Sequence, residues 1–343
     1  MDKCFKVVVT DLVADALEPE RAVLGDLAEI VALDARDESE LAGRIEGADA
    51  VMLYHAISMS APTIERLERC RAIVRCGAGY DNVDGEAALR QGIPVANVPD
   101  YGTEEVADSA IGLMLALTRG IAALNTRLRA GRAPWDYSQT APLYRLRNQV
   151  FAIIGLGRIG TAAAMRAKAF GINVCFYDPY KPDGYDKALG LNRARCLEEL
   201  LERAHVVSMH CPLTAETRHM MNGSSISIMP KGSYLLNTAR GAVLDTAAIP
   251  DAIATGQLAG AGIDVLEREP PSDDDPLIRA WRDPGHPAYD RVLINPHSAF
   301  YCEEGLEEMR RKGAEECRRA LLGEPLRNVV NGIHFGGVAA CQH

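Results

Sequence analysis

The sequence predicts an α/β fold built from two domains, each with a doubly wound parallel sheet. Short apolar segments with the length of buried strands alternate with helical segments up to about residue 97, as in successive βαβ units. The same alternation starts again at Val150 and continues to about residue 294. The length of 343 residues leaves room for two domains, each with its own core.

The first series of segments predicts a small parallel sheet. Helices are expected at residues 38–46, 61–70 and 83–91, between the apolar runs. Because strands and helices alternate, the strands are expected to run parallel. The expected strands are residues 6–10, 28–33, 50–54, 72–75 and 93–97.

The second series opens with a glycine-rich turn between a strand and a helix. The apolar run Val150–Ile154 leads into Gly155-Leu156-Gly157-Arg158-Ile159-Gly160, which is followed by an alanine-rich helical segment. The first glycine allows a sharp turn, the second lets the backbone approach a pyrophosphate, and the third lets helix and strand pack closely. The helix N-terminus would direct N–H groups and its positive dipole end at the phosphates. The turn therefore predicts a Rossmann-type dinucleotide site.

The acid that ends the next strand indicates which dinucleotide binds. Asp178 follows the glycine turn by roughly 20 residues, where a carboxylate accepts hydrogen bonds from the adenosine ribose. A carboxylate would repel a 2′-phosphate, and Pro179-Tyr180 offers no arginine to hold one. The sequence predicts NAD rather than NADP.

Several polar residues follow directly on the predicted strands of both series. Further strands are expected at 172–177, 205–209, 233–236, 260–265 and 291–294, and further helices at 106–119, 196–203, 246–255 and 303–322. In parallel α/β sheets, ligands bind outside the carboxyl ends of the strands. The residues that this rule selects are Gly77, Ala78, Gly79, Cys211, Pro212, Thr238, Ala239, Arg240, Asp264 and His297.

Three of the side chains in this region carry the chemistry expected of a catalytic site. The guanidinium of Arg240 presents a fork of donors suited to a carboxylate and a neighbouring carbonyl. His297 is a candidate proton donor or acceptor, and Glu269 could orient its imidazole and favour the charged form. Each has an ordinary alternative: a salt bridge for Arg240, a solvated loop acid for Glu269, a core histidine for His297. Their joint placement at strand ends of a nucleotide-binding domain favours catalysis.

These motifs resemble, in their order along the chain, those of the D-isomer-specific 2-hydroxyacid dehydrogenase family. The resemblance extends from about Val7 to about Asn331. It is carried by RCGAGYDN at 75–82, the glycine turn, NTARG at 237–241, GIDV at 262–265 followed by Glu269-Pro270, and PHSA at 296–299. Within the family the chain most resembles the C-terminal-binding-protein branch, through YHAI at 54–57, EEVADS at 104–109, AKAFG at 167–171 and FYDPY at 176–180.

The resemblance implies a reaction and the residues that perform it. NADH would donate a hydride to the carbonyl carbon of a 2-keto acid while His297 protonates the forming alkoxide. Arg240 would hold the carboxylate and the keto oxygen, and Glu269 would keep the imidazole protonated near neutrality. The family has no catalytic metal, and the sequence shows no cluster of metal ligands.

The resemblance also implies binding roles for the remaining site residues. Backbone N–H groups from Gly77 to Gly79 and the Arg75 side chain would bind the substrate carboxylate, and Tyr54 and His55 would line the substrate site. Asp264 would bond the nicotinamide amide, and the ring would be lined by Thr238 and Ala239.

Two positions depart from the pattern of the C-terminal-binding-protein branch. Val106 replaces a threonine expected near the pyrophosphate, which removes one phosphate hydrogen bond. Phe300 follows the histidine motif where many family members carry small residues, and the branch has a tryptophan–tyrosine pair there. An aromatic ring at Phe300 predicts a bounded, apolar side-chain pocket, with core packing as the alternative.

The expected organisation places the active site in the cleft between the two domains. Residues 1–100 with 301–331 would form the discontinuous substrate-binding domain, residues 101–300 the NAD-binding domain, and residues 332–343 a flexible tail. The apolar helix 106–119 and the aromatic arm at 131–144 are expected to form a homodimer interface.

Composition excludes several other classes of partner. The net charge is −10 and shows no basic stripe, which argues against nucleic acid as a partner. No apolar run approaches the roughly 20 residues of a membrane span, and the first residues lack the apolar core of a signal peptide. Nine cysteines without a CxxC pair suit a reducing cytoplasm, with buried, inert thiols.

A second class of function remains open at this point. An NAD(H)-sensing scaffold, a dimer that recruits protein partners as C-terminal-binding corepressors do, would use the same nucleotide site with little turnover. A scaffold needs none of Arg240, Glu269 and His297, and the chain has all three. The enzyme is therefore the favoured prediction.

Overall fold

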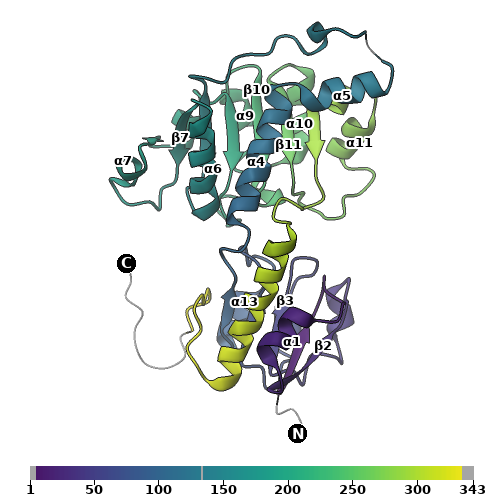
Figure 1. Cartoon of the computed structure of the whole chain (residues 1–343), viewed down its shortest axis with the longest axis vertical. Helices are drawn as coiled ribbons and strands as arrows, with labels where there is room; N and C mark the ends of the chain where they lie inside the picture. The colour runs from purple at the N-terminus through teal and green to yellow at the C-terminus, as the bar shows by residue number, and fades with distance from the viewer. Residues whose placement is uncertain (1–4, 133, 334–343) are drawn as a thin grey trace. The chain divides into compact units, whose positions relative to one another are not determined.

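The computed structural model describes residues 5–132 and 134–333 and divides the chain into two units. The first unit comprises the chain up to Gly102 together with the chain from Tyr301 onward, and the second comprises Thr103–Phe300. Figure 1 shows the strands and helices of each unit. Of the tail expected at 332–343, all but the first two residues lie outside the described part of the chain.

In the described part of the first unit, five parallel strands form one sheet in the order β2-β1-β3-β4-β5. Each expected strand of the first series is confirmed. The apolar strand residues are buried on both faces, as parallel sheets covered by helices require. The strands are β1 Phe5–Val9, β2 Ala28–Ala32, β3 Ala50–Leu53, β4 Ile73–Arg75 and β5 Val95–Asn97.

One face of this sheet is covered by the helices α1 (Glu18–Leu24) and α13 (Glu303–Leu322), which pack against each other (Figure 1). The buried Arg310 of α13 joins them. Its guanidinium donates to both carboxylate oxygens of Glu20, at 2.7 Å each, and to Asp15 at 2.7 and 2.8 Å. The α13 helix has the bounds that its sequence pattern predicts.

The other face packs on shorter helices than the sequence predicts. The α3 helix is Gly85–Arg90, but α2 ends at Ile64 and the helix expected at 38–46 is a single 3₁₀ turn, Glu38–Leu41. Gly43 has a φ of 79°, a left-handed conformation that interrupts a right-handed helix. The Glu38 carboxylate accepts hydrogen bonds from the Ser60 N–H and hydroxyl, which fixes the turn against the start of α2.

In the described part of the second unit, seven parallel strands are ordered β12-β11-β10-β9-β6-β7-β8. The chain builds the sheet outward from β6 in one direction through β7 and β8, then returns to the other side of β6 for β9 to β12. The boundary between the neighbouring strands β6 and β9 is therefore the topological switch point of this sheet. The strands are β6 Val150–Ile154, β7 Asn173–Tyr177, β8 Asn192–Arg193, β9 Val206–Met209, β10 Ser233–Asn237, β11 Leu258–Ile263 and β12 Val292–Ile294. Only the two-residue β8 lacks a predicted counterpart.

The helices α4 (Thr103–Thr118) and α6 (Arg158–Ala169) lie together on one face of this sheet (Figure 1). The apolar residues of α4 pack into one core with β6, β7 and α6. A side chain at Gly262 of β11 would lie 3.1 Å from the Cβ atom of Leu113, so the glycine lets α4 lie close to the strand. Most apolar residues of α4 therefore pack on the sheet of their own unit, and the homodimer interface expected at this helix stays a prediction.

The opposite face carries a second core formed by α8 to α12. These helices are short: α8 Leu197–Leu201, α9 Gly223–Ile228, α10 Ile249–Ala254, α11 Pro276–Arg282 and α12 Ala288–Arg291, with α7 (Tyr185–Leu189) following β7. The helix α5 (Ile121–Arg129), which the sequence pattern did not predict, buries none of its residues. After it, the irregular arm contains one 3₁₀ turn, Tyr137–Thr140.

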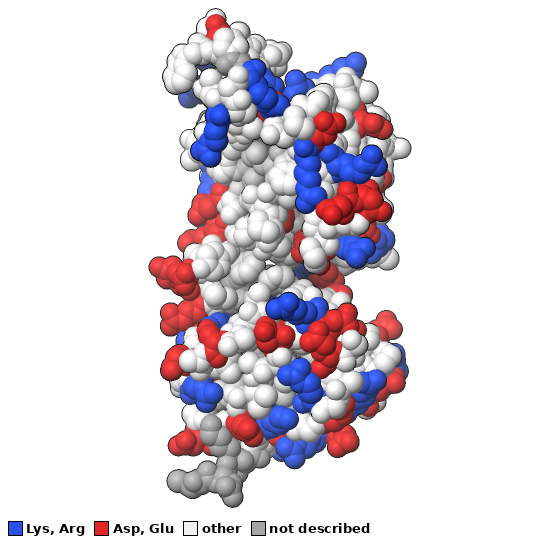
Figure 2. Space-filling view, turned by 90° about the vertical axis from the view of Figure 1, so that its right-hand side faces the viewer, with Lys and Arg blue, Asp and Glu red and all other residues white. Residues whose placement is uncertain are grey.

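Among the described residues, no single helix is long and apolar enough to cross a membrane; α4 and α5, bent by 61°, pass that test only as a pair. On the face that Figure 2 presents, acidic and basic side chains lie interspersed over both units.

Candidate active site

The glycine turn after β6 has the geometry of a phosphate-binding loop. Gly155 has a φ of 87°, and a side chain there would lie 2.7 Å from the Cys211 backbone nitrogen. A side chain at Gly160 would overlap the Gly155 carbonyl, whereas one at Gly157 would meet nothing within 4 Å. Gly157 also starts α6 without a side-chain cap. The turn is therefore closely packed underneath and open at Gly157, where a pyrophosphate must approach.

Asp178 joins the glycine turn to the end of β7. Its Oδ2 atom accepts the Leu156 N–H at 2.8 Å, and its Oδ1 atom accepts the Tyr180 N–H at 3.0 Å. Two backbone hydrogen bonds hold the carboxylate beside the turn, where the sequence predicts the adenosine ribose.

Two buried polar atoms at the switch point support the fit of a dinucleotide. The Nδ1 atom of His210 and the Oγ1 atom of Thr238 are shielded from solvent and have no hydrogen-bond partner among the described residues. Buried polar atoms in native structures nearly always have partners. A ligand rich in ribose and phosphate oxygens would supply them. Thr238 was predicted from its position after a strand, but His210 was not.

The two residues predicted to act in catalysis as a pair, His297 and Glu269, lie in contact in the second unit. The His297 Nδ1 atom lies 2.7 Å from Glu269 Oε2, and Glu269 Oε1 accepts the Leu266 N–H at 2.7 Å. The backbone N–H of His297 donates to the Asp264 carbonyl at 2.8 Å. The Phe300 ring meets the imidazole edge-on, with 6.3 Å between the ring centroids.

Asp264 shapes the turn that carries His297. Its Oδ1 atom accepts the N–H groups of Ser298 at 2.9 Å and of Ala299 at 3.0 Å. The pKa of the Asp264 carboxyl is raised, because the effect of burial exceeds that of these two hydrogen bonds, which lower it. The contact predicted between Asp264 and the nicotinamide amide stays a prediction.

The Arg240 turn lies against the loop that carries Glu269. Asn237 closes the turn by accepting the Ala239 N–H at 3.0 Å and donating to the Arg240 carbonyl at 2.9 Å. A side chain at Gly241 would overlap the Leu266 carbonyl group. The lack of a side chain at Gly241 therefore lets the Arg240 and Glu269 segments pack together.

The other predicted cofactor residues lie near the glycine turn or at a helix start. Cys211 is buried, and burial raises the pKa of its thiol to about 12, so it is a neutral thiol at physiological pH. The Pro212 carbonyl accepts the Thr217 hydroxyl at 2.7 Å. Val106 is buried in the first turn of α4. Their cofactor contacts stay predictions.

In the first unit, the predicted carboxylate ligands meet at the end of β4. Arg75 Nη1 donates to the Cys76 carbonyl at 3.1 Å, and a side chain at Gly77 would overlap this guanidinium. Gly77 has a φ of 145°, and the carbonyl of Ala78 accepts the Asn97 amide at 2.7 Å. Arg75 and the backbone from Gly77 to Gly79 thus form one polar group, and carboxylate binding there stays a prediction.

The structure corrects the role predicted for Tyr54. Its side chain is 0% exposed, and Cys76, Glu20 and Arg310 of the same unit lie close enough to influence its hydroxyl. Burial raises the pKa of Tyr54 well above its ordinary value. Tyr54 directly follows β3 and its side chain is buried in the core of the first unit, whereas the neighbouring His55 is half-buried.

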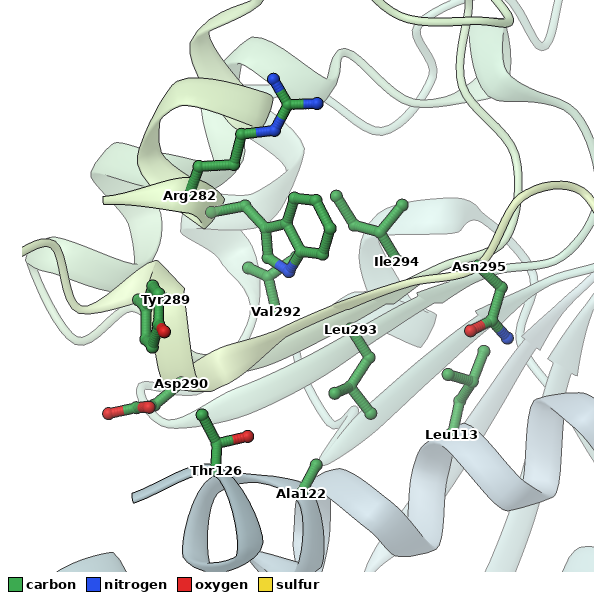
Figure 3. A pocket seen from close by; sticks show the side chains of 11 residues that line it. Leu113, Ala122, Thr126, Arg282, Tyr289, Asp290, Val292, Leu293, Ile294 and Asn295 are labelled. Atoms are coloured by element: carbon green, nitrogen blue, oxygen red, sulfur yellow. The ribbon is translucent and has the colours of Figure 1, made fainter. Parts of the chain in front are cut away.

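A pocket of about 500 Å³ lies elsewhere on the second unit, along the edge strand β12 (Figure 3). Ala122 and Thr126 of α5 border it opposite the strand. It contains none of the predicted site residues. Its lining is Leu113, Ala122, Thr126, Trp281, Arg282, Tyr289, Asp290, Val292, Leu293, Ile294 and Asn295.

Comparisons with known proteins identify relatives of the chain. The chain is 35% identical over 327 residues to D-3-phosphoglycerate dehydrogenase of Methanocaldococcus jannaschii, covering 95% of this chain and 59% of that protein. It is 32% identical over 334 residues to C-terminal-binding protein 1 of Caenorhabditis elegans, covering 92% and 43%. The chain thus spans about half the length of these curated relatives.

A solved structure and a family model extend the comparison. The crystal structure of D-lactate dehydrogenase from Aquifex aeolicus, complexed with NAD and lactic acid, matches with a TM-score of 0.82 and 28% identity, covering 93% of this chain and 96% of that one. The model of the D-isomer specific 2-hydroxyacid dehydrogenase NAD-binding domain matches residues 111–299. The chain belongs to the D-isomer-specific 2-hydroxyacid dehydrogenase family, and residues 111–299 are its NAD-binding domain.

Proposed function

We propose that this protein is an NAD-dependent D-2-hydroxyacid dehydrogenase that acts mainly as a 2-keto acid reductase. The observation that carries the proposal is the His297–Glu269 pair, with 2.7 Å between Nδ1 and Oε2. It lies on loops that pack against the Arg240 turn through Gly241. A proton donor, its orienting carboxylate and an oxyanion-binding guanidinium are the groups that keto acid reduction requires.

The residues of the second unit divide the work of the reaction. The bound nicotinamide supplies the hydride when the keto acid is reduced and accepts it in the reverse direction. Arg240 binds the substrate carboxylate and polarises the keto oxygen through its fork of donors. His297 delivers a proton from Nε2 to the forming alkoxide, because its Nδ1 atom is engaged with Glu269. Glu269 stabilises the imidazolium and fixes the plane of the ring.

We propose that NAD is preferred over NADP. The Asp178 carboxylate, held by the Leu156 and Tyr180 N–H groups, would accept the ribose hydroxyls and repel a 2′-phosphate. The carboxylate of Asp178 therefore discriminates by charge.

We also propose that the protein forms a homodimer through α5 and the arm that follows it. No residue of α5 is buried, and the arm exposes 92% of Trp135 and 88% of Tyr137. Exposed aromatic and apolar side chains this close together favour a protein interface. Light scattering should show that Trp135→Ser shifts a dimer towards monomer, whereas Leu89→Ser, at an exposed apolar position of α3, does not. An unchanged dimer in Trp135→Ser would contradict this interface.

The experiment that tests the enzymatic proposal is NADH oxidation across a panel of 2-keto acids, from glyoxylate to bulky apolar ones. We expect turnover that is abolished by Arg240→Ala, and the preferred side chain tests the pocket predicted from Phe300. Tight NADH binding without turnover of any keto acid would contradict the enzyme and support the NAD(H)-sensing scaffold.

A further inference from the structure

His210 occupies the centre of the nucleotide-binding edge of the second sheet. Ile154 of β6 and Asn237 of β10 both pair with Met209 of β9, so the residue after Met209 lies between the residues that follow β6 and β10. Those residues are Gly155 and Thr238. The His210 backbone N–H donates to the Ile154 carbonyl at 2.8 Å. His210 therefore lies at the switch point, where open parallel sheets bind their ligands.

One ring nitrogen of His210 is tethered and the other is not. Its Nε2 atom lies 2.8 Å from the hydroxyl oxygen of Ser208, which is fully buried in β9. Its Nδ1 atom is buried and has no hydrogen-bond partner among the described residues. Burial lowers the pKa of His210 to about 4, so near neutral pH the ring is uncharged, with one nitrogen donating and the other accepting.

A second unpaired atom lies on the neighbouring strand end. The Oγ1 atom of Thr238, which follows β10, is also buried without a partner in the described part of the chain. A buried polar atom that stays unpaired destabilises the folded protein. Two of them, on adjacent strand ends beside the glycine turn, indicate that a polar ligand completes the site.

We propose that His210 is a positioning residue for the cofactor, whose Nδ1 atom, together with Thr238 Oγ1, hydrogen-bonds the ribose–pyrophosphate part of NAD while Ser208 holds Nε2. This inference rests on the proposed function, since it takes the dinucleotide as the bound ligand. The reaction at His297 does not require it. Its role is to hold the nucleotide at the switch point.

A pair of variants separates the two ring nitrogens. The amide of asparagine places a polar atom near the Nδ1 position, whereas the longer glutamine reaches the Nε2 position beside Ser208. We expect His210→Asn to bind NADH within about threefold of the wild-type Kd and His210→Gln to bind at least tenfold more weakly, by calorimetric titration. Weaker binding in His210→Asn alone, or equal effects in both variants, would overturn the proposal.

A second pair keeps the test decisive if a His210 variant fails to fold. Thr238→Val removes the hydroxyl at constant shape and should weaken NADH binding at least threefold, and Thr238→Ser should restore it. Wild-type affinity in Thr238→Val would count against the proposal. NADH binding is measured without a keto acid. A lack of turnover would therefore contradict the proposed enzyme, but the binding titrations would still test the role of His210.

Discussion

The Nδ1 atom of His297 lies 2.7 Å from the Oε2 atom of Glu269, whose other oxygen accepts the Leu266 N–H at 2.7 Å. The carboxylate therefore bridges the backbone and the imidazole. This bridge fixes the ring, and the proposed proton exchange with the substrate is assigned to Nε2. The catalytic predictions follow from it.

Replacement of the histidine removes the proton donor and leaves the nucleotide site intact. We expect His297→Ala to lower kcat by about 10²- to 10⁴-fold, the range for loss of a general acid. The Kd for NADH should stay within about twofold of wild type, by fluorescence titration. A large loss of NADH affinity would contradict the assignment of His297 to the chemical step.

Neutralisation of Glu269 tests its charge separately from its shape. Glu269→Gln keeps an acceptor for the Leu266 N–H, but it loses the negative charge opposite the imidazolium. Hydrogen bonds to charged groups contribute about 1.5–3 kcal/mol, so kcat should fall roughly 10- to 100-fold. The control is Glu267→Gln, which neutralises an exposed acid two residues away and should leave kcat near wild type. Equal kcat values in the two variants would refute the role of Glu269.

Asp178 is proposed to discriminate between NAD and NADP by its charge. Asp178→Asn keeps the size of the side chain and removes the repulsion of a 2′-phosphate. We expect the ratio of kcat/KM for NADH to that for NADPH to fall by about tenfold or more. Steady-state kinetics with both cofactors measures this ratio, and an unchanged ratio would show that another residue discriminates.

Two alanine substitutions in the glycine turn separate binding from folding. Gly157→Ala adds a side chain where nothing lies within 4 Å, so the melting temperature should stay the same and NADH binding should weaken at least tenfold. Gly160→Ala overlaps the Gly155 carbonyl, so it should destabilise the protein by about 1–3 kcal/mol even without NADH. Thermal melts and NADH titrations of both variants give the comparison. Equal melting temperatures would contradict the packing described for Gly160.

His210 makes the stability of the protein depend on pH. Burial lowers its pKa to about 4 from the ordinary value of 6.5, so the unfolded chain binds the proton more readily than the folded one. The contribution of the neutral His210 ring to the free energy of unfolding is complete above about pH 6.5. It is lost as the pH falls towards 4, by up to about 1.4 kcal/mol per pH unit. His210→Asn should lose less stability than wild type over this interval, in urea unfolding at several pH values. Parallel stability curves would contradict the neutral, buried ring.

The parts of the site predicted from the sequence are those with a local pattern. Gly155, Gly157, Gly160 and Asp178 lie within one strand–turn–helix–strand stretch, where spacing alone fixes their placement. Arg240 and His297 were selected as candidates because parallel strands end at the same edge of a sheet.

Other features depend on contacts between distant segments. Tyr54 and His55 both follow β3, and only the packing of α13 on the sheet shows that Tyr54 belongs to the core. The close packing of α4 on the sheet depends on Gly260 and Gly262 of β11, about 150 residues further along the chain, where a side chain would lie 3.1 Å from an atom of Leu117 or Leu113. His210 ends a predicted strand like any other residue, because an unpaired ring nitrogen has no sequence pattern.

The ion pair of Arg310 with Glu20 determines when the first unit can complete its fold during synthesis. The two residues are 290 positions apart, and Glu20 is fully buried, so its charge has no compensating guanidinium until nearly the whole chain has been made. At roughly 5–20 residues per second, a ribosome needs about 15–60 s to cover that distance. Thr103–Phe300 is complete before Arg310 emerges. The nucleotide-binding unit is therefore fully translated, and free to fold, before the α13 helix of the first unit has been made.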